Sequence, residues 1–161
     1  MKYRIGFGYD VHRLEDGEHL FLGGISIPSG KRAVGHSDAD VLIHALCDAL
    51  LGAANLGDIG QHFPDTDAAY KGIDSKILLQ QVMDLVRGKG FLLGNADMTV
   101  CLEKPKVMPH ASAMQEALAK VMKCDADCLS IKATTNEKLG YIGREDGICA
   151  YAVVLLEKVV T

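Results

Sequence analysis

The alternation of apolar and polar positions predicts a strand at the start of the chain. Apolar side chains occupy every second position from Tyr3 to Tyr9, and Gly6 and Gly8 lie between them. This two-residue period is that of an extended strand, and the glycines leave room for another backbone or a ligand to come close. Asp10 and His12 follow directly, and on a continuing extended chain their side chains point to the same side.

Three later segments repeat apolar residues at the spacing of one helical face. The first helix is predicted to begin near Ser37, whose hydroxyl can cap the first turn, with Asp40 completing an acidic variant of the capping box. Glycines from Gly52 onward are expected to end it. The other two helices are expected over residues 74–88 and 110–123.

Short apolar runs at 20–22 and 25–27 predict a hairpin around two glycines, and a turn is expected at 15–17. The remaining predicted strands cover residues 92–102, 129–133 and 148–160. The order is strand, hairpin, helix, helix, strand, helix, strand, strand. This order favours an α+β fold: one domain over residues 1–161, with helices packed on one face of a mixed four-stranded sheet plus a small hairpin.

Composition narrows the class of protein. With 161 residues, 48% hydrophobic and 24% charged, the chain is large enough to bury a core and has the make-up of a soluble domain. A net charge of −4 argues against a nucleic-acid partner. No apolar run approaches a membrane span and no signal segment opens the chain, so we expect no membrane partner and a cytoplasmic location.

The five cysteines are odd in number and dispersed, which favours free thiols in a reducing compartment. Cys124 and Cys128 are closely spaced, but no second Cys or His pair completes a zinc site with them.

Asp10, His12 and His44 are the candidate metal ligands. His44 lies on the first predicted helix, and one carboxylate with two imidazoles suits a catalytic zinc that keeps its fourth position open. The alternatives are a surface Asp and His in a loop and a structural histidine beside the core. Asp48, one helical turn beyond His44, is either an acceptor that orients an imidazole or an ordinary surface acid.

Other polar clusters follow the predicted strands. Lys104 and Lys106 flank a proline, and residues 134–137 join two hydroxyls to Glu137 ahead of Arg144. Lysines and hydroxyls suit a phosphate, and Glu137 is a hard oxygen ligand of the kind magnesium takes, although such groups also lie commonly in water.

Several blocks together carry a family resemblance: GFGYDVH at 6–12, GHSDADV at 35–41 with His44 and Asp48, LLGA at 50–53, GDIG at 57–60, FPDTD at 63–67, Lys106 with Pro109-His110, KATTNEKLG at 132–140, and Gly143-Arg144. In this combination the chain resembles the 2-C-methyl-D-erythritol 2,4-cyclodiphosphate synthases of the non-mevalonate isoprenoid pathway over nearly its whole length. Asn136 stands where the family has Thr, and Val107-Met108 vary the apolar lining, without altering a ligand or a charge.

The resemblance implies a homotrimer with active sites between subunits, which converts 4-diphosphocytidyl-2-C-methyl-D-erythritol 2-phosphate to the 2,4-cyclodiphosphate and releases CMP. The implied metal ligands are Asp10, His12 and His44 for Zn²⁺, and Glu137 for a second divalent ion, Mg²⁺ or Mn²⁺, that binds with the substrate. His36 and Thr135 are the implied catalytic residues, which stabilise the transition state. Lys106, Thr135 and Glu137 are expected to complete the site from the adjacent subunit.

The implied substrate contacts comprise Ser37, Asp58, Ile59, Gly60, Phe63, Pro64, Asp65, Thr66 and Asp67 for the methylerythritol phosphate portion; Leu102, Glu103, Lys104, Pro105, Lys106, Val107, Met108, Ala133, Thr134 and Thr135 for the cytidine nucleotide; and Asp10, Val11, His12, His36, Asn136, Glu137, Tyr141 and Arg144 at further positions. Two other functions are compatible with the same residues: a zinc phosphoesterase, and a nucleotide-binding or isoprenoid-sensing module without turnover.

Overall fold

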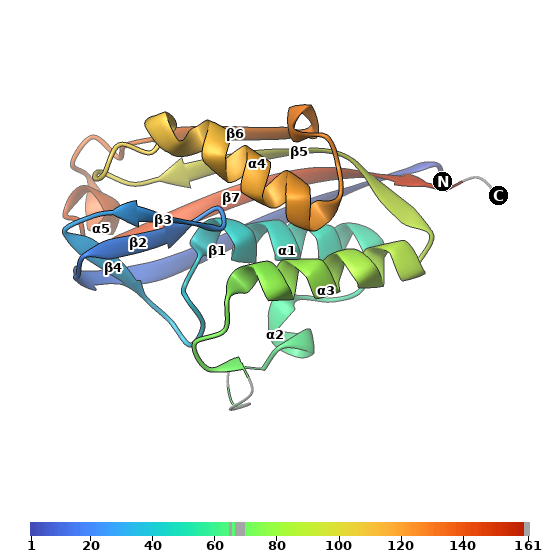
Figure 1. The fold of residues 1–161 in the computed structure, drawn as a ribbon, viewed down its shortest axis with the longest axis horizontal. Helices are drawn as coiled ribbons and strands as arrows, with labels where there is room; N and C mark the ends of the chain where they lie inside the picture. Colours follow the sequence, from blue (N-terminus) through green and yellow to red (C-terminus); the bar gives the residue numbers. More distant parts are fainter. Residues whose placement is uncertain (65, 67–69, 160–161) are drawn as a thin grey trace.

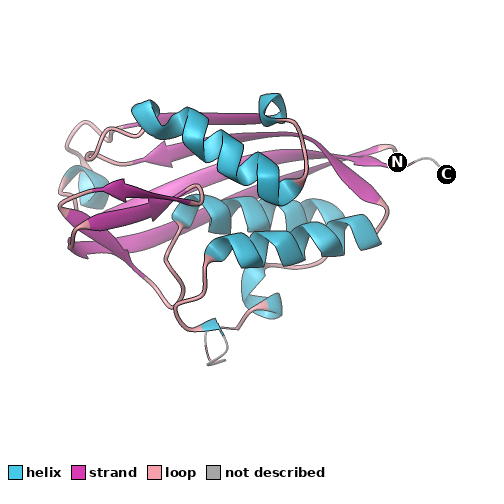
Figure 2. Ribbon diagram, viewed as in Figure 1, coloured by secondary structure: helices cyan, strands magenta, loops and turns pink. Residues whose placement is uncertain are grey.

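A five-stranded mixed sheet forms one layer of the molecule, and the helices lie against it (Figures 1 and 2). The computed structural model describes residues 1–64, 66 and 70–159. The strand order of this sheet is β4-β1-β7-β5-β6, and β5 and β6 are the only neighbouring strands in it that run parallel. The strands are β1 Tyr3–Asp16, β4 Lys31–Val34, β5 Phe91–Cys101, β6 Leu129–Thr134 and β7 Gly147–Lys158, and β2 His19–Leu22 with β3 Ile25–Pro28 forms the separate hairpin.

The predicted α+β class and the hairpin are confirmed, but the prediction of four strands is wrong. The chain does not turn at 15–17, because β1 continues to Asp16 and pairs with β4 from Arg13↔Val34 to Asp16↔Lys31. The four residues of β4 show no clear alternation of apolar and polar side chains. Their strand conformation comes from hydrogen bonding to β1, which a local sequence pattern does not report.

One face of the sheet is covered by three long helices: α1 Val41–Ala54, α3 Ser75–Gly88 and α4 Ala111–Met122 (Figure 1). Gly6 and Gly8 explain how α1 lies so close to β1. A Cβ atom at either glycine would come within 1.9 Å of a carbonyl oxygen of α1, so only glycine fits there. The alternate β1 side chains face away from α1, and Ile5 and Phe7 are 74% and 63% exposed. The sheet therefore has one covered face and one open, apolar face.

The first helix begins later than predicted, and Asp40 rather than Ser37 is its N-cap. The buried Asp40 carboxylate accepts hydrogen bonds from the backbone amides of Ile43, Gly23 and Gly24 at 3.1, 2.9 and 2.7 Å. Burial raises the pKa of Asp40, although these hydrogen bonds oppose the shift. The Asp40 side chain thus joins the start of α1 to the hairpin turn. Because it is hydrogen-bonded to both elements, Asp40 is favoured over Ser37 as the cap.

The other helices begin close to their predicted positions. Asp74 caps α3 by accepting a hydrogen bond from the Lys76 amide at 2.9 Å. Within the described residues, four short helices have no counterpart in the predicted elements: α2 Ile59–His62, α5 Gly140–Gly143, and the 3-10 turns η2 Met108–His110 and η3 Ala126–Cys128. No helix within the described residues is long and apolar enough to cross a membrane. All five cysteines are free thiols, as expected.

Candidate metal centre and substrate cavity

Asp10, His12 and His44 meet where β1 passes the N-terminal half of α1. Asp10 Oδ2 lies 3.0 Å from His12 Nε2 and 3.1 Å from His44 Nδ1, and the two nitrogens are 3.1 Å apart. All three residues are partly buried. These three atoms form a small triangle of one oxygen and two nitrogens, and this donor set fits an open zinc site. We call it the donor triangle.

The backbone fixes the orientation of the His12 ring. His12 Nδ1 lies 3.1 Å from the carbonyl oxygen of Val34, on β4. A carbonyl oxygen only accepts hydrogen bonds, so Nδ1 carries the hydrogen and the Nε2 lone pair is directed into the donor triangle. The strand that the sequence pattern did not reveal therefore orients one of the three donors.

The carboxylate and the imidazoles of the donor triangle stabilise each other's charged forms. Burial alone would raise the pKa of Asp10, but the imidazole rings of His12 and His44, which in their protonated forms donate hydrogen bonds to its carboxylate, outweigh burial and lower the pKa to about 2. Burial opposes the charged form of His44 as well, yet the hydrogen bond and negative charge of Asp10 raise its pKa above the usual value. The site therefore stabilises a positive charge beside the Asp10 carboxylate, and a metal ion would supply one.

The donor triangle opens into a cavity of about 470 Å³, which we call the metal cavity. It is lined by Asp10, His12, His36, Ser37, His44, Asp48, Ile59, Gly60, Phe63, Pro64, Tyr70, Ile73 and Leu78. Most of the residues predicted to hold the methylerythritol phosphate portion are among them. Asp58 is not: it caps α2 by accepting from the Gln61 amide at 3.0 Å. Val11 and Thr66 are exposed outside this lining, and Asp65 and Asp67 lie outside the described residues.

Asp48 does not contact the donor triangle through any hydrogen bond found in the described part of the chain. Its Oδ1 accepts instead from the backbone amide of Ile59 at 2.7 Å, which fastens α2 to α1. The suggestion that Asp48 orients an imidazole therefore lacks structural support. Ser75 fills that place, since its Oγ lies 2.9 Å from His44 Nε2. The sequence marks Ser75 only as part of a helix start, and nothing local connects it with His44.

A second predicted cluster gathers at the ends of β5 and β6 around a cavity of about 290 Å³, which we call the nucleotide pocket after the ligand that the sequence predicts there. It is lined by Leu102, Glu103, Pro105, Lys106, Val107, Met108, Pro109, Ala133, Thr134 and Thr135. Beside it, Glu103 accepts hydrogen bonds from the amides of Asn136 and Lys138 at 2.9 and 3.3 Å. Thr135 Oγ1 donates to Glu137 Oε1 at 3.1 Å, so both predicted functional groups lie on one turn held by Glu103.

The metal cavity and the nucleotide pocket share no lining residue. The structure therefore brings the predicted site residues together in two groups rather than one. Among the described residues, eight predicted site residues lie outside both linings: Val11, Asp58, Thr66, Lys104, Asn136, Glu137, Tyr141 and Arg144. Of these, Lys104 pairs with Glu145 at 3.1 Å, Tyr141 and Tyr9 join their hydroxyls at 3.3 Å, and Arg144 Nε donates to Asp146 at 2.9 Å.

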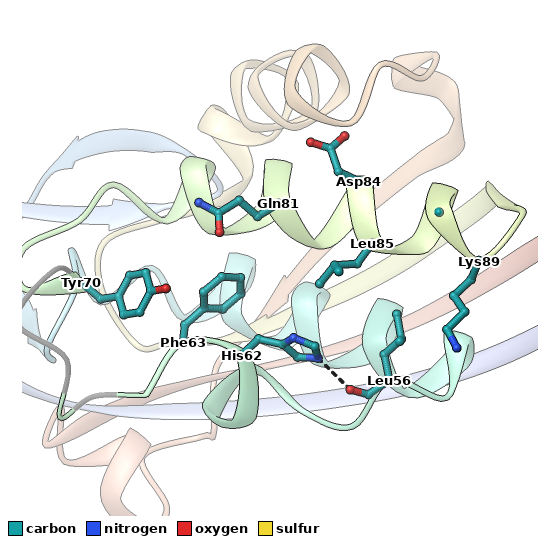
Figure 3. A pocket seen from close by; sticks show the side chains of 9 residues that line it. Leu56, His62, Phe63, Tyr70, Gln81, Asp84, Leu85 and Lys89 are labelled. Atoms are coloured by element: carbon teal, nitrogen blue, oxygen red, sulfur yellow. Dashed lines mark hydrogen bonds between the residues drawn. The ribbon is translucent and has the colours of Figure 1, made fainter.

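A larger cavity, about 650 Å³, adjoins the metal cavity between α2 and α3 (Figure 3). The two share Phe63 and Tyr70, whose rings meet edge to face at 5.5 Å. Figure 3 shows His62 turned toward Leu56, whose carbonyl accepts from His62 Nε2 at 2.7 Å. Within the described residues, the only group of three metal-binding side chains is the donor triangle. Size alone therefore does not identify the functional cavity.

A mixed sheet with helices on one face, and a donor triangle at the base of a cavity, define an α+β protein with the arrangement of a metalloenzyme. The chain matches the YgbB family over residues 3–157. A Bacteroides fragilis protein is 58% identical, with 99% of this chain and 100% of the relative aligned. A Porphyromonas gingivalis protein is 60% identical over 96% of this chain and 95% of its own length. Both are named 2-C-methyl-D-erythritol 2,4-cyclodiphosphate synthase.

Solved structures agree with the sequence comparison. The bifunctional IspDF from Campylobacter jejuni superposes with a TM-score of 0.94 at 42% identity, covering 98% of this chain and 43% of that one. A 2C-methyl-D-erythritol-2,4-cyclodiphosphate synthase in a CDP-bound form gives 0.88 at 43% identity, covering 96% of this chain and all of the other. The chain belongs to the YgbB family of 2-C-methyl-D-erythritol 2,4-cyclodiphosphate synthases, and it is an enzyme.

Proposed function

We propose that this enzyme is a phosphorus-oxygen lyase of the non-mevalonate isoprenoid pathway in the cytoplasm. It converts 4-diphosphocytidyl-2-C-methyl-D-erythritol 2-phosphate to 2-C-methyl-D-erythritol 2,4-cyclodiphosphate and releases CMP. The observation that carries the proposal is the donor triangle of Asp10, His12 and His44 in a chain that matches synthases of this name from end to end.

The reaction needs no nucleophile from the protein, because a phosphate oxygen of the substrate attacks its own diphosphate. The five free thiols therefore have no part in it. The enzyme must hold a flexible substrate in a ring-closing conformation, and orientation of this kind is worth up to about 7–11 kcal/mol in favourable cases. The metal cavity, about 470 Å³ in volume, is large enough to bind the sugar phosphate portion.

Two metal ions are proposed. Asp10, His12 and His44 hold Zn²⁺ and Glu137 holds Mg²⁺ or Mn²⁺, and such ions supply Lewis-acid stabilisation of phosphate charge. The chain's own groups do the rest. His36 and Ser37 line the metal cavity near the triangle, where they bind phosphate oxygens. Thr135 and Lys106 line the nucleotide pocket, where a hydroxyl and a cation bind the departing CMP phosphate. A solved relative in a CDP-bound form supports nucleotide binding by this fold.

We further propose that the enzyme is a homotrimer and that each active site combines the metal cavity of one subunit with the nucleotide pocket of the next. Two observations support this. Within one chain the two linings have no residue in common. The open face of the sheet carries exposed apolar side chains, among them Ile5, Phe7 and Val153 at 74%, 63% and 44%. Contiguous apolar surface of this kind is typical of an oligomer interface.

Phosphorus NMR of the purified enzyme with its diphosphocytidyl substrate and Mg²⁺ tests the reaction. The proposal predicts resonances of a cyclic diphosphate together with CMP. A zinc phosphoesterase would instead give inorganic phosphate or a linear product, and a binding module would leave the substrate intact. Either of these results would overturn the proposed reaction.

A further inference from the structure

A hydrogen-bonded series of three polar side chains, His44, Ser75 and Asp38, leads from the back of the donor triangle into the protein. His44 presents Nδ1 to the triangle, and its other ring nitrogen, Nε2, lies 2.9 Å from Ser75 Oγ. Ser75 Oγ in turn donates to Asp38 Oδ1 at 2.5 Å. Ser75 is fully buried at the first turn of α3, whereas His44 belongs to α1. These hydrogen bonds therefore connect α1 and α3 behind the site.

The directions of these hydrogen bonds follow from counting hydrogens. A serine hydroxyl has a single hydrogen, and here Asp38 receives it. Ser75 Oγ therefore faces His44 with a lone pair, so the hydrogen between them belongs to His44 Nε2. In the neutral ring the hydrogen is then on Nε2, and Nδ1 keeps its lone pair beside Asp10 and His12.

Asp38 is itself held in place from two sides. Its Oδ2 accepts from the backbone amide of Ser75 at 3.0 Å, and its Oδ1 accepts from the amide of Asp40 at 3.2 Å. Ser37 Oγ also lies 3.1 Å from His44 Nε2, but it accepts from the Ala39 amide rather than donating to a carboxylate. The arrangement through Ser75 is thus the shorter contact and has its hydroxyl direction fixed.

We propose that Ser75 and Asp38 are positioning residues for the metal ligand His44. They hold the ring in the tautomer and orientation that point Nδ1 at the metal, in the manner of the carboxylates that commonly support metal-binding histidines. The proposal rests on the proposed zinc site, and it assigns to two residues outside the donor set a share of the zinc affinity.

The first test is zinc affinity, measured by competition with a chelator in the wild type and in Ser75→Ala. We expect the variant to bind zinc about 10 to 100 times more weakly, the usual effect of losing such a support. Proton NMR of the zinc-loaded proteins supplies the second readout. The buried Nε2 hydrogen of wild-type His44 should exchange slowly with water, and in Ser75→Ala its resonance should shift and exchange faster.

Asp38→Asn tests the last member of this hydrogen-bonded series with a side chain of the same shape. Asparagine replaces one of the two carboxylate oxygens by an NH₂ group, so at these positions either the amide or the hydroxyl of Ser75 loses its acceptor. We expect a loss of zinc affinity within the same range. Because the two residues act through one contact, the double variant should lose little more than either single variant. Fully additive losses would contradict a common path to His44.

Asp74→Ala is the matched control, since Asp74 caps the same turn of α3 without touching His44. It should lower the melting temperature yet leave zinc affinity and the Nε2 hydrogen unchanged. If it weakens zinc binding as much as Ser75→Ala does, helix stability explains the effect and the proposal fails.

The two proposals fail differently. A wild type that binds no zinc contradicts the metal site itself. A wild type that binds zinc, with Ser75→Ala and Asp38→Asn that bind it equally well, contradicts only the positioning role. If Ser75→Ala does not fold, Asp38→Asn alone decides by the same measurements.

Discussion

The metal cavity and the nucleotide pocket are built differently. Around the donor triangle, each functional atom has a partner on another element: His12 contacts β4, and His44 contacts β1 and α3. Around the nucleotide pocket, Lys106 and Glu137 lie exposed at the open ends of β5 and β6, and Glu103 holds the nearby turn through backbone amides. One region is organised within a single chain, whereas the other is an open surface.

This difference indicates a division of labour. A metal site needs its donors held within a few tenths of an ångström, and the packed interface of β1, α1 and α3 provides that rigidity. A pocket at the exposed end of two strands is suited to be closed by another molecule. In the proposed trimer, that molecule is the neighbouring subunit together with the substrate.

The largest expected effect comes from removing a donor. His44→Ala should abolish tight zinc binding and lower activity by about a thousandfold or more, since Lewis-acid stabilisation of a phosphoryl group is worth several kcal/mol. Zinc content by elemental analysis and CMP release measure the two losses. His62→Ala is the control, because His62 lines the larger adjoining cavity and lies outside the donor triangle. Equal zinc loss in both variants would contradict the assignment.

A smaller effect is expected in the nucleotide pocket. Lys106→Ala should lower kcat/KM by about 10- to 100-fold, because a hydrogen bond to a charged phosphate contributes about 1.5–3 kcal/mol. Zinc content should not change, and this separates the two regions. Lys132→Ala, whose amine is paired with Asp97 at 2.6 Å on the neighbouring strand, should behave like wild type. A loss of zinc in Lys106→Ala would show that the regions are not independent.

The smallest effect concerns pH. Zinc and a proton compete for Nδ1 of His44, and Asp10 raises the pKa of this histidine despite its burial. Zinc affinity should therefore weaken as the pH falls through the raised pKa, by up to about tenfold per pH unit for one proton. Asp10, with a pKa of about 2, stays ionised and adds no pH dependence near neutrality. Chelator competition at several pH values measures this, and a constant affinity across the neutral range would contradict it.

Much of this architecture could be predicted from periodicity. The first strand, the hairpin and the long helices follow local patterns, and so does the placement of Asp10 and His12 on one side of an extended chain. Strand β4 was missed because Lys31–Val34 has no apolar alternation, and only pairing with β1 makes it a strand. Strand β4 also matters for the metal site, because the carbonyl oxygen of its Val34 orients the His12 ring.

The contact of Ser75 with His44 could not be predicted from the sequence for a related reason. Helical spacing places Asp48 one turn from His44, but the amide of Ile59 takes its carboxylate. Ser75 lies 31 residues away and reaches His44 only because α3 packs against α1. Likewise, Ser37 and Asp40 are both good capping residues, and the hairpin amides that favour Asp40 come from another part of the chain.

Mixing two inactive subunits tests most directly the claim that each active site is shared between chains. His44→Ala subunits keep the nucleotide pocket, and Thr135→Ala/Glu137→Ala subunits keep the donor triangle. Coexpressed in equal amounts, they should recover about one quarter of wild-type activity, because a head-to-tail interface pairs the two intact halves with that probability. Mixed oligomers, verified by mass spectrometry, that stay as inactive as either parent would contradict the shared site.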